Sequence, residues 1–173
     1  MIFNNSKELF QRVLFEIRSD MPYEVYIFTY GLWAGVNDNG VCFNKNNIYQ
    51  LLYFLNIMHE EIKTTVVVGY DNNISERILQ TAKRFNKLKF VVSMDTHIKC
   101  ILTSTGILSI GSSNLTDSEW HELNVCERVD VESEKYIGIL RYLKMVVFYG
   151  DEITDSYYSD VSIEDIISNV VNK

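Results

Sequence analysis

The chain has 173 residues, of which 47% are hydrophobic, and its formal net charge at pH 7 is −7. This length suits one compact domain, and the apolar fraction is sufficient for a core, which excludes a disordered or low-complexity protein. The acidic balance counts against polyanion binding through net charge, although local fields govern an individual site. No stretch approaches ~18 uninterrupted apolar residues, and the N-terminus lacks the features of a secretory signal.

Alternating helix and strand patterns fill the first part of the chain. The spacing of apolar residues predicts helices over 6–19, 48–62 and 76–85, with Ser6 as the N-cap of the first. Runs of β-branched and aromatic residues predict buried strands over 23–30, 64–70 and 88–94. The segment 31–47 is rich in turn residues and is expected to be a loop. The order β-α-β-α-β predicts a mostly parallel sheet with helices on its faces.

The pattern changes after Asp95. Two short strands over 98–102 and 107–110 are separated by Thr-Ser-Thr-Gly, which predicts a hairpin. A further strand is expected over 124–131 and an apolar helix over 136–149. Residues 151–173 hold six acids and one base, so the remainder of the chain is close to neutral. We expect a single domain over 1–173 with an acidic tail from about 151.

The cysteines indicate the compartment. Cys42, Cys100 and Cys126 are widely spaced, form no C-x-x-C motif and lack the spacing of metal ligands. An odd number of such cysteines favours reduced, structural thiols. We therefore expect an intracellular, cytoplasmic protein.

Five polar or small residues around the predicted hairpin form a candidate site. His97 and Lys99 are two residues apart on a predicted strand, so their side chains project from the same face. Gly111, Ser112 and Asn114 follow the next strand, whose end lies beside the start of the first. The side chains can thus converge on a patch roughly 5–8 Å across. Imidazole, ammonium, hydroxyl and carboxamide groups suit a phosphoryl group, whose charge must be held while a bond breaks. Gly111 would allow close approach of the backbone.

This stretch resembles the motif of the phospholipase D superfamily, H-x-K-x4-D-x6-G-S-x-N. The five residues just named match at the family's spacing, and the β-α-β-α-β order over about 20–150 resembles the family's half-domain. The family's Asp, usually a supporting residue, is replaced here by Ser104. The resemblance implies a phospholipase D-like half-domain of the α/β class, with a mostly parallel mixed sheet flanked by helices.

The resemblance also implies a mechanism. Family active sites use two motifs related by a two-fold axis, so a chain with one motif is expected to form a homodimer. His97 would form a phosphohistidine, while the second copy of His97 protonates the leaving oxygen. Lys99 and Asn114 would hold the non-bridging oxygens of the substrate, and Ser112 would help to orient these side chains. Because lysine replaces the metal used by other phosphoryl-transfer enzymes, no cofactor is implied.

A carboxylate downstream of G-S-x-N commonly orients the family's histidine. Glu122 is the favoured candidate here, and Glu127 is the other. A pairing of His97 with His121 inside one chain is a rival arrangement, but no lysine and asparagine bracket His121. His121 and His59 are otherwise expected at the surface.

Other features allow two interpretations. A basic cluster precedes the strand that leads to His97, and it comprises Lys83, Arg84, Lys87 and Lys89. It is either a solvated helix end or an edge that follows nucleic-acid phosphates. Three aromatic residues in or near 31–47 could stack on bases or form core or dimer contacts: Tyr30, Trp33 and Phe43.

The sequence therefore predicts a metal-independent, endonuclease-like phosphodiesterase that acts as a homodimer on nucleic acid, either DNA or RNA. Nucleic acid is favoured over lipid because the chain lacks a membrane-binding apolar or basic amphipathic segment, so no membrane partner is expected. Two alternatives stay open. One is a dimer of the same fold that binds a nucleic acid or a partner without turnover, and the other is a lipid phosphodiesterase or phosphatidyl transferase.

Overall fold

The computed structural model describes residues 1–32, 47–70, 76–94, 96–112, 114 and 123–153. The helices in this part of the chain are α1 (Ser6–Asp20), α2 (Asn47–Ile57), α3 (Glu76–Arg84) and α4 (Glu134–Tyr149). The strands are β1 (Ile2–Phe3), β2 (Glu24–Thr29), β3 (Lys63–Tyr70), β4 (Lys89–Met94), β5 (Cys100–Thr103), β6 (Ile107–Gly111), β7 (Asn124–Arg128) and β8 (Asp151–Glu152). The strands form one sheet in the order β1-β7-β6-β5-β2-β3-β4-β8.

The sheet is mixed and flanked by helices, as expected, but the prediction that it is mostly parallel is wrong. Among the seven strand pairings within the described ranges, only β2–β3 and β3–β4 are parallel. These two pairs come from β-α-β units, in which a helix returns the chain to the starting edge. The second part of the chain adds antiparallel hairpins, and the two-residue strands β1 and β8 pair antiparallel at the edges of the sheet.

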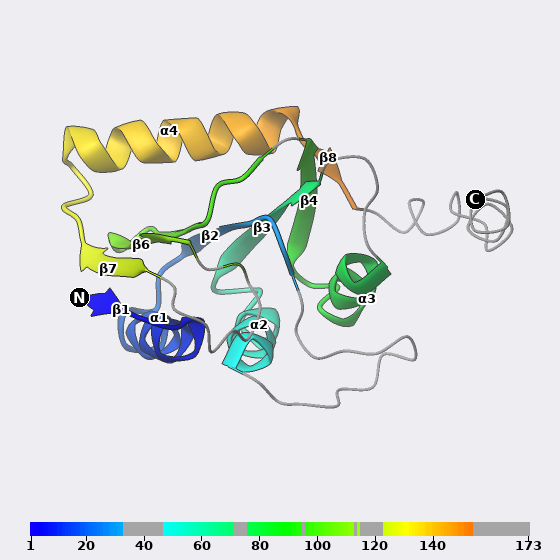
Figure 1. Cartoon of the computed structure of the whole chain (residues 1–173), viewed down its shortest axis with the longest axis horizontal. Helices are drawn as coiled ribbons and strands as arrows, with labels where there is room; N and C mark the ends of the chain where they lie inside the picture. The colour runs from blue at the N-terminus through cyan, green and yellow to red at the C-terminus, as the bar shows by residue number, and fades with distance from the viewer. Residues whose placement is uncertain (33–46, 71–75, 95, 113, 115–122, 154–173) are drawn as a thin grey trace, which may run out of the picture.

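Two apolar cores lie on opposite faces of this sheet. Helices α1, α2 and α3 cover one face, and α4 crosses the other (Figure 1). The larger core includes Ile17, Leu52 and Phe85, and the smaller core beneath α4 includes Phe28 and Leu143. Burial of such side chains is the main stabilising contribution to the fold. No helix in the described part of the chain is long and apolar enough to cross a membrane.

The helix ends differ slightly from the sequence prediction. The N-cap of α1 is Asn5 rather than Ser6, because Asn5 Oδ1 accepts a hydrogen bond from Glu8 N at 2.9 Å. Met21 ends α1 in the left-handed conformation, with φ of 46°, and its N–H donates to Ile17 O at 2.9 Å. The expected acidic tail begins as β8 beside β4, while residues 154–173 lie outside the described ranges.

Apart from its outer strands β1 and β8, the sheet has two further edges, which are formed by the ends of its strands. The parallel strands β2, β3 and β4 end on the same edge. Strand β5 begins there and β6 ends there, because Cys100 pairs with both Phe28 and Ile110. Strand β7 also begins there, because Asn124 pairs with Gly111. We call this the carboxyl edge. The other edge, called the amino edge, holds the starts of β2, β3 and β4 and the β5–β6 turn. The six residues of β2 separate the two edges by roughly 20 Å.

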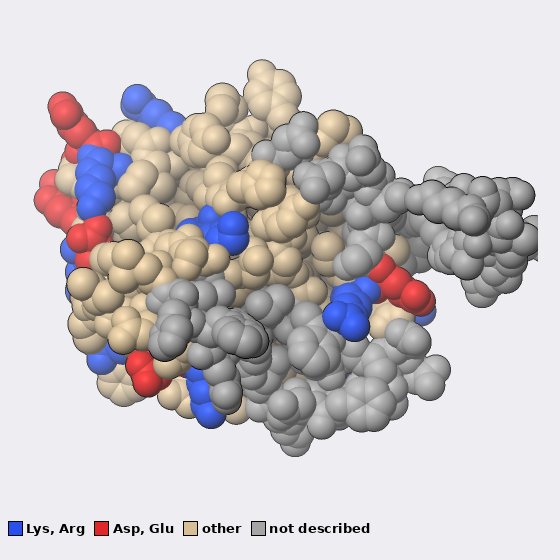
Figure 2. Space-filling model, in the orientation of Figure 1, with Lys and Arg blue, Asp and Glu red and all other residues tan. Residues whose placement is uncertain are grey.

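Charged side chains gather on the side of the molecule where α1, β7 and the start of α4 lie (Figures 1 and 2). Arg128 of β7 binds both Glu16 and Asp20 of α1, with its Nη1 2.6 Å from Asp20 Oδ2. The hydrogen bond from Arg128 holds the pKa of Asp20 below its usual value. These ion pairs tie the β7 end of the sheet to α1.

Candidate functional site

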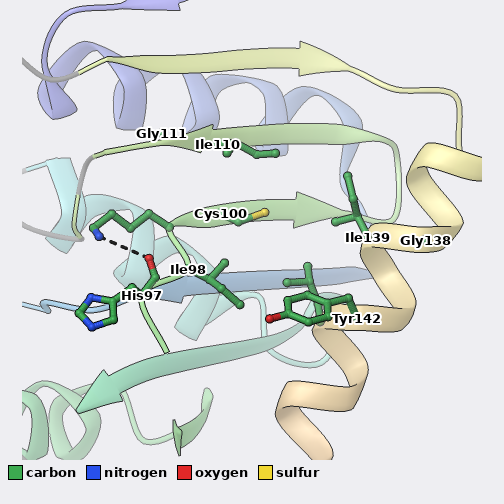
Figure 3. A pocket seen from close by; sticks show the side chains of 10 residues that line it. His97, Ile98, Cys100, Ile110, Gly111, Gly138, Ile139 and Tyr142 are labelled. Carbon is green, nitrogen blue, oxygen red and sulfur yellow. Dashed lines mark hydrogen bonds between the residues drawn. The ribbon is translucent and has the colours of Figure 1, made fainter. Parts of the chain in front are cut away.

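His97 and Lys99 lie at the carboxyl edge, in the segment that leads from β4 into β5. The predicted strand begins at Ile98, but β5 begins at Cys100, so Lys99 precedes the strand. Lys99 Nζ donates to the backbone oxygen of His97 at 3.4 Å (dashed line in Figure 3). His97 is exposed and Lys99 is half-buried. The ammonium group of Lys99 thus contacts the backbone of the residue that carries the exposed imidazole, at an accessible edge of the sheet.

The β5–β6 hairpin brings the start of G-S-x-N beside H-x-K. Gly111 N donates to Lys99 O at 3.3 Å, next to the pairing of Cys100 with Ile110. The predicted convergence of these two chain segments is therefore present for Lys99 and Gly111. The glycine itself is required by β7, because a Cβ at Gly111 would lie 2.1 Å from Asn124 Oδ1.

Ser112 and Asn114 bind neighbouring backbone groups at the same edge. Ser112 Oγ accepts from Leu123 N at 3.1 Å, and Asn114 Oδ1 accepts from Gly31 N at 3.0 Å. Asn114 therefore joins the segment after β6 to the end of β2. Since the backbone N–H of Gly31 must donate, the bonded atom of Asn114 is its oxygen, and Nδ2 carries the two hydrogens that this side chain can donate.

The ring of His97 stacks on Tyr30, a contact that the sequence analysis did not identify. The ring centroids are 4.4 Å apart and the planes are inclined by 15°. Gly69 at the end of β3 makes room for this arrangement, because a Cβ there would lie 1.9 Å from Thr96 O and 3.0 Å from Tyr30 Cδ2. The available signal was the pairing of glycine with tyrosine where two strands end, at Tyr30-Gly31 and at Gly69-Tyr70.

Two carboxylates, Glu122 and Glu127, are the predicted candidates for orienting His97. Glu122 lies outside the described residues, as does His121. Glu127 binds Lys135 of α4 and pairs in register with Leu108, which places it away from the carboxyl end of β6. The structure therefore does not bring Glu127 to His97.

Other residues singled out in the sequence lie elsewhere. His59 follows α2, where its ring nitrogens contact Asn56 O at 3.1 Å and Glu60 Oε1 at 3.0 Å. The basic cluster lies at the end of α3 and the start of β4, hence at the amino edge, with Lys89 only 3.0 Å from Glu152. It does not adjoin the candidate site. Trp33, Phe43 and Cys42 lie outside the described residues.

Ser104, which replaces the family's Asp, also lies at the amino edge. Ser104 Oγ accepts from Glu24 N at 3.2 Å, and Ser104 N donates to Glu24 O at 2.9 Å. The residue thus closes the pairing of β5 with β2, a full strand length from His97. Its polar side chain satisfies a backbone donor, which is a structural task.

A pocket with a volume of about 510 Å³ opens beside His97 and Lys99, between β5, β6 and α4 (Figure 3). Its walls are mainly apolar, and the main contributors are Ile98, Cys100, Ile110, Ile139, Tyr142 and Leu143. Burial raises the pKa of the Cys100 thiol to about 12, so this thiol is neutral near pH 7. Within the described ranges, no three His, Cys, Asp or Glu side chains are placed to hold a metal ion.

No protein-family model and no curated protein sequence matches the chain. Solved structures do. Nuc, a phospholipase D family member from Salmonella typhimurium, gives a TM-score of 0.62 at 14% identity, over 90% of this chain and 99% of its own. NucT from Helicobacter pylori gives 0.57 at 13% identity, over 88% of this chain and 98% of its own. TrmBL2, an archaeal chromatin protein with a novel mode of DNA binding, gives a TM-score of 0.51 at 10% identity, over 88% of this chain and 54% of its own. At these identities the similarity establishes the fold.

Proposed function

The chain has the phospholipase D fold, and we propose that it is a metal-independent phosphodiesterase that cleaves nucleic acid as a homodimer. One observation carries the proposal: the hydrogen bond from Gly111 N to Lys99 O joins the H-x-K segment to the G-S-x-N segment at the exposed carboxyl edge of this fold. His97 and Lys99 directly precede β5 and Asn114 follows β6, so the required groups flank one hairpin of the sheet.

The chemistry of the half-site suits phosphoryl transfer. The imidazole of His97 is exposed and supplies a nucleophile, while the ammonium of Lys99, bound to the same backbone segment, supplies a fixed positive charge. The Nδ2 hydrogens of Asn114 are further donors for a non-bridging oxygen. Preorganised donors of this kind stabilise charge that develops in a transition state. Lysine provides the charge neutralisation for which many phosphoryl-transfer enzymes use a metal.

We propose a second copy because the sequence carries one H-x-K and one G-S-x-N, whereas the phospholipase D active sites that it resembles use two of each. Apolar side chains flank the carboxyl edge on both sides of the half-site. Met94 at the end of β4 is 62% exposed, and Leu123, which is hydrogen-bonded to Ser112, is 65% exposed. Large apolar side chains exposed on both sides of a polar site favour a protein contact there. We therefore propose that two carboxyl edges meet around a two-fold axis.

The proposed reaction has two steps. A ring nitrogen of His97 attacks phosphorus, the bond from phosphorus to the leaving oxygen breaks, and that oxygen takes a proton from the partner subunit's His97. The partner subunit's His97 then takes a proton from water, whose oxygen attacks phosphorus and breaks the phosphorus–nitrogen bond. Both imidazoles return to their starting states, and one water is consumed per bond cleaved. The two steps need one imidazole as nucleophile and the other as acid and then base, and two copies of His97 related by a two-fold axis can take these roles.

The position of Ser104 bears on the alternative of a dimer that binds without turnover. The replacement of the family's Asp by Ser104 and the acidic tail from about residue 151 are the features that favour that alternative. Because Ser104 binds the start of β2 at the amino edge, its identity does not alter the groups around His97. The similarity to TrmBL2, a chromatin protein that binds DNA, supports nucleic acid as the substrate class.

Cleavage assays test this proposal. Labelled single- and double-stranded DNA and RNA are incubated with the wild-type chain in the presence of EDTA, beside His97→Ala, Lys99→Ala and the matched control His59→Ala. We expect cleavage by the wild type and by His59→Ala, and a loss of at least ~100-fold in the other two variants. Loss of all cleavage on chelation, or full activity of His97→Ala, would contradict the proposal.

A further inference from the structure

We propose that the pocket between β5, β6 and α4 receives one unpaired nucleobase of the substrate, next to the phosphodiester that is cleaved. The preferred substrate is then single-stranded at that nucleotide. This inference rests on the proposed function, because it takes the phosphorus to lie at His97. It adds a base-binding site and a strand preference to the reaction.

The pocket and the half-site share their rim. His97, Lys99 and Gly111 line the pocket as well as the carboxyl edge. A phosphodiester has two substituents that leave the phosphorus in different directions. With phosphorus at His97, one of the substituents can reach this pocket across the rim that the two sites share. The chemistry of the pocket walls therefore selects that substituent.

The walls favour an apolar, flat group. Away from the rim they consist of aliphatic side chains, the neutral Cys100 thiol and Tyr142, and the volume of about 510 Å³ lies within the range of small-molecule sites. A sugar or a phosphate would lose its hydration there without gaining partners. A nucleobase has apolar faces, and its polar edge can point to the open mouth of the pocket. These properties favour a base as the occupant.

Tyr142 supplies a stacking surface. Its side chain is 51% exposed, and Figure 3 shows it pointing from α4 towards Ile98 across the pocket. Stacking of a base on an aromatic ring is tolerant of sequence, since every base has a π-face. A base held in this way is no longer stacked on its neighbours or paired with a second strand. A duplex must therefore open locally before it fits.

A larger side chain at Gly138 would fill part of the pocket, which provides a test of its role. Gly138 lies on α4 and lines the pocket, and a Cβ built there meets no atom within 4 Å. A leucine at this position would extend into the free space. Glycine is among the poorest helix-forming residues, so Gly138→Leu should not weaken α4. Loss of binding in this variant would report on the pocket rather than on folding.

The test measures binding without turnover. In a His97→Asn background, fluorescence anisotropy at one fixed salt concentration compares a labelled single strand, its duplex and a fully abasic strand of equal length. We expect the single strand to bind about tenfold more tightly than either of the other two. Gly138→Leu should weaken binding of the single strand by a similar factor and leave the abasic strand unchanged. Because phosphate contacts are the same in the two strands, this difference isolates the base.

Variants at Tyr142 of α4 test whether its ring stacks on the base. Tyr142→Ala should weaken binding of the single strand, and Tyr142→Phe should restore it, since only the ring is needed. Phe148→Ala is the matched control, because Phe148 is an aromatic residue of α4 that is 80% exposed and does not line the pocket. A melting temperature for Gly138→Leu at or above that of its parent confirms that the fold is intact.

The outcomes separate this inference from the proposed function. Equal binding of intact and abasic strands, or no effect of Gly138→Leu, would overturn the base-binding site even if the wild type cleaves nucleic acid. Displacement of the single strand by vesicles of phosphatidylcholine, with lipid binding lost in Gly138→Leu, would assign the pocket to an acyl chain and also overturn it. The expected binding pattern without any cleavage by the wild type would support the base-binding site and contradict the proposed phosphodiesterase activity.

Discussion

The imidazole of His97 stacks on the phenol ring of Tyr30, with centroids 4.4 Å apart and planes inclined by 15°. Tyr30 follows β2, whereas His97 follows β4, so the contact joins two strands that β3 separates in the sheet. The contact limits the orientations open to the imidazole before any substrate is bound. Such positioning matters for a group that must approach phosphorus from one direction.

Replacement of Tyr30 tests this positioning role. Tyr30→Phe keeps the stacked ring and should retain kcat within about twofold, whereas Tyr30→Leu removes the ring and should lower kcat about tenfold. KM should change little in both variants, since the ring orients His97 rather than holding substrate. Steady-state kinetics on a single-stranded substrate provide the measurement. An equal loss in both variants would show that the hydroxyl, and not the stacked ring, is required.

Gly69 should be among the least replaceable residues of the fold. A Cβ there would lie 1.9 Å from Thr96 O, so Gly69→Ala must displace the segment that carries His97. We expect a loss of about 1–3 kcal/mol in the free energy of unfolding, together with loss of cleavage.

Gly138→Ala is the matched control for Gly69→Ala, because a Cβ at Gly138 meets no atom within 4 Å. This change should be neutral or stabilising by up to ~1 kcal/mol. Urea unfolding of both variants provides the comparison. Similar stabilities of the two variants would mean that the close approach of β3 to Thr96 is absent in solution.

Ser104 should affect stability and leave catalysis intact. Ser104→Ala removes the acceptor for Glu24 N, a donor at the start of β2, and should cost about 1 kcal/mol of the free energy of unfolding. Cleavage measured well below the melting temperature should match the wild type. A loss of kcat as large as that of Lys99→Ala, with stability unchanged, would show that Ser104 takes part in catalysis and would contradict this prediction.

The carboxyl edge should carry the dimer contact. Met94→Asp and Leu123→Arg each place a charge on an apolar residue that flanks the half-site, and both should convert the dimer to a monomer and abolish cleavage. Ile57→Arg is the control, because Ile57 is 54% exposed but is the last residue of α2. Only residues 58–62 separate it from the start of β3 at the amino edge. Light scattering gives the mass in solution. A stable, active monomer would refute the shared site.

The sequence predicted the parts of the fold that have a long local pattern. The periodic apolar residues of α1 and the β-branched run of β3 appear close to their expected positions. The strands β1 and β8 were missed because two residues cannot display an alternating pattern, and they form only where β7 and β4 offer a partner. The proportion of parallel pairs was wrong for a different reason: it was inferred from the β-α-β units, whereas most antiparallel pairs involve strands of the second part of the chain.

In the candidate site, likewise, local contacts could be predicted from the sequence and long-range contacts could not. The adjacency of Lys99 and Gly111 follows from a hairpin, which is a local feature, and it was predicted. The contacts of Tyr30 with His97 and of Asn114 with Gly31 join residues far apart in sequence, and no local pattern encodes them. The exclusion of Glu127 depends on its ion pair with Lys135, which likewise requires the tertiary structure.

Trapping the covalent intermediate tests the central claim most directly. Acid-free quenching of the wild-type chain during turnover of a labelled strand, followed by peptide mass spectrometry, should find the nucleotide phosphate attached to a nitrogen of His97. The adduct should be absent from His97→Asn and should accumulate when hydrolysis is slowed at low temperature. Cleavage that proceeds at the wild-type rate in His97→Asn, with no adduct on any histidine, would contradict the account.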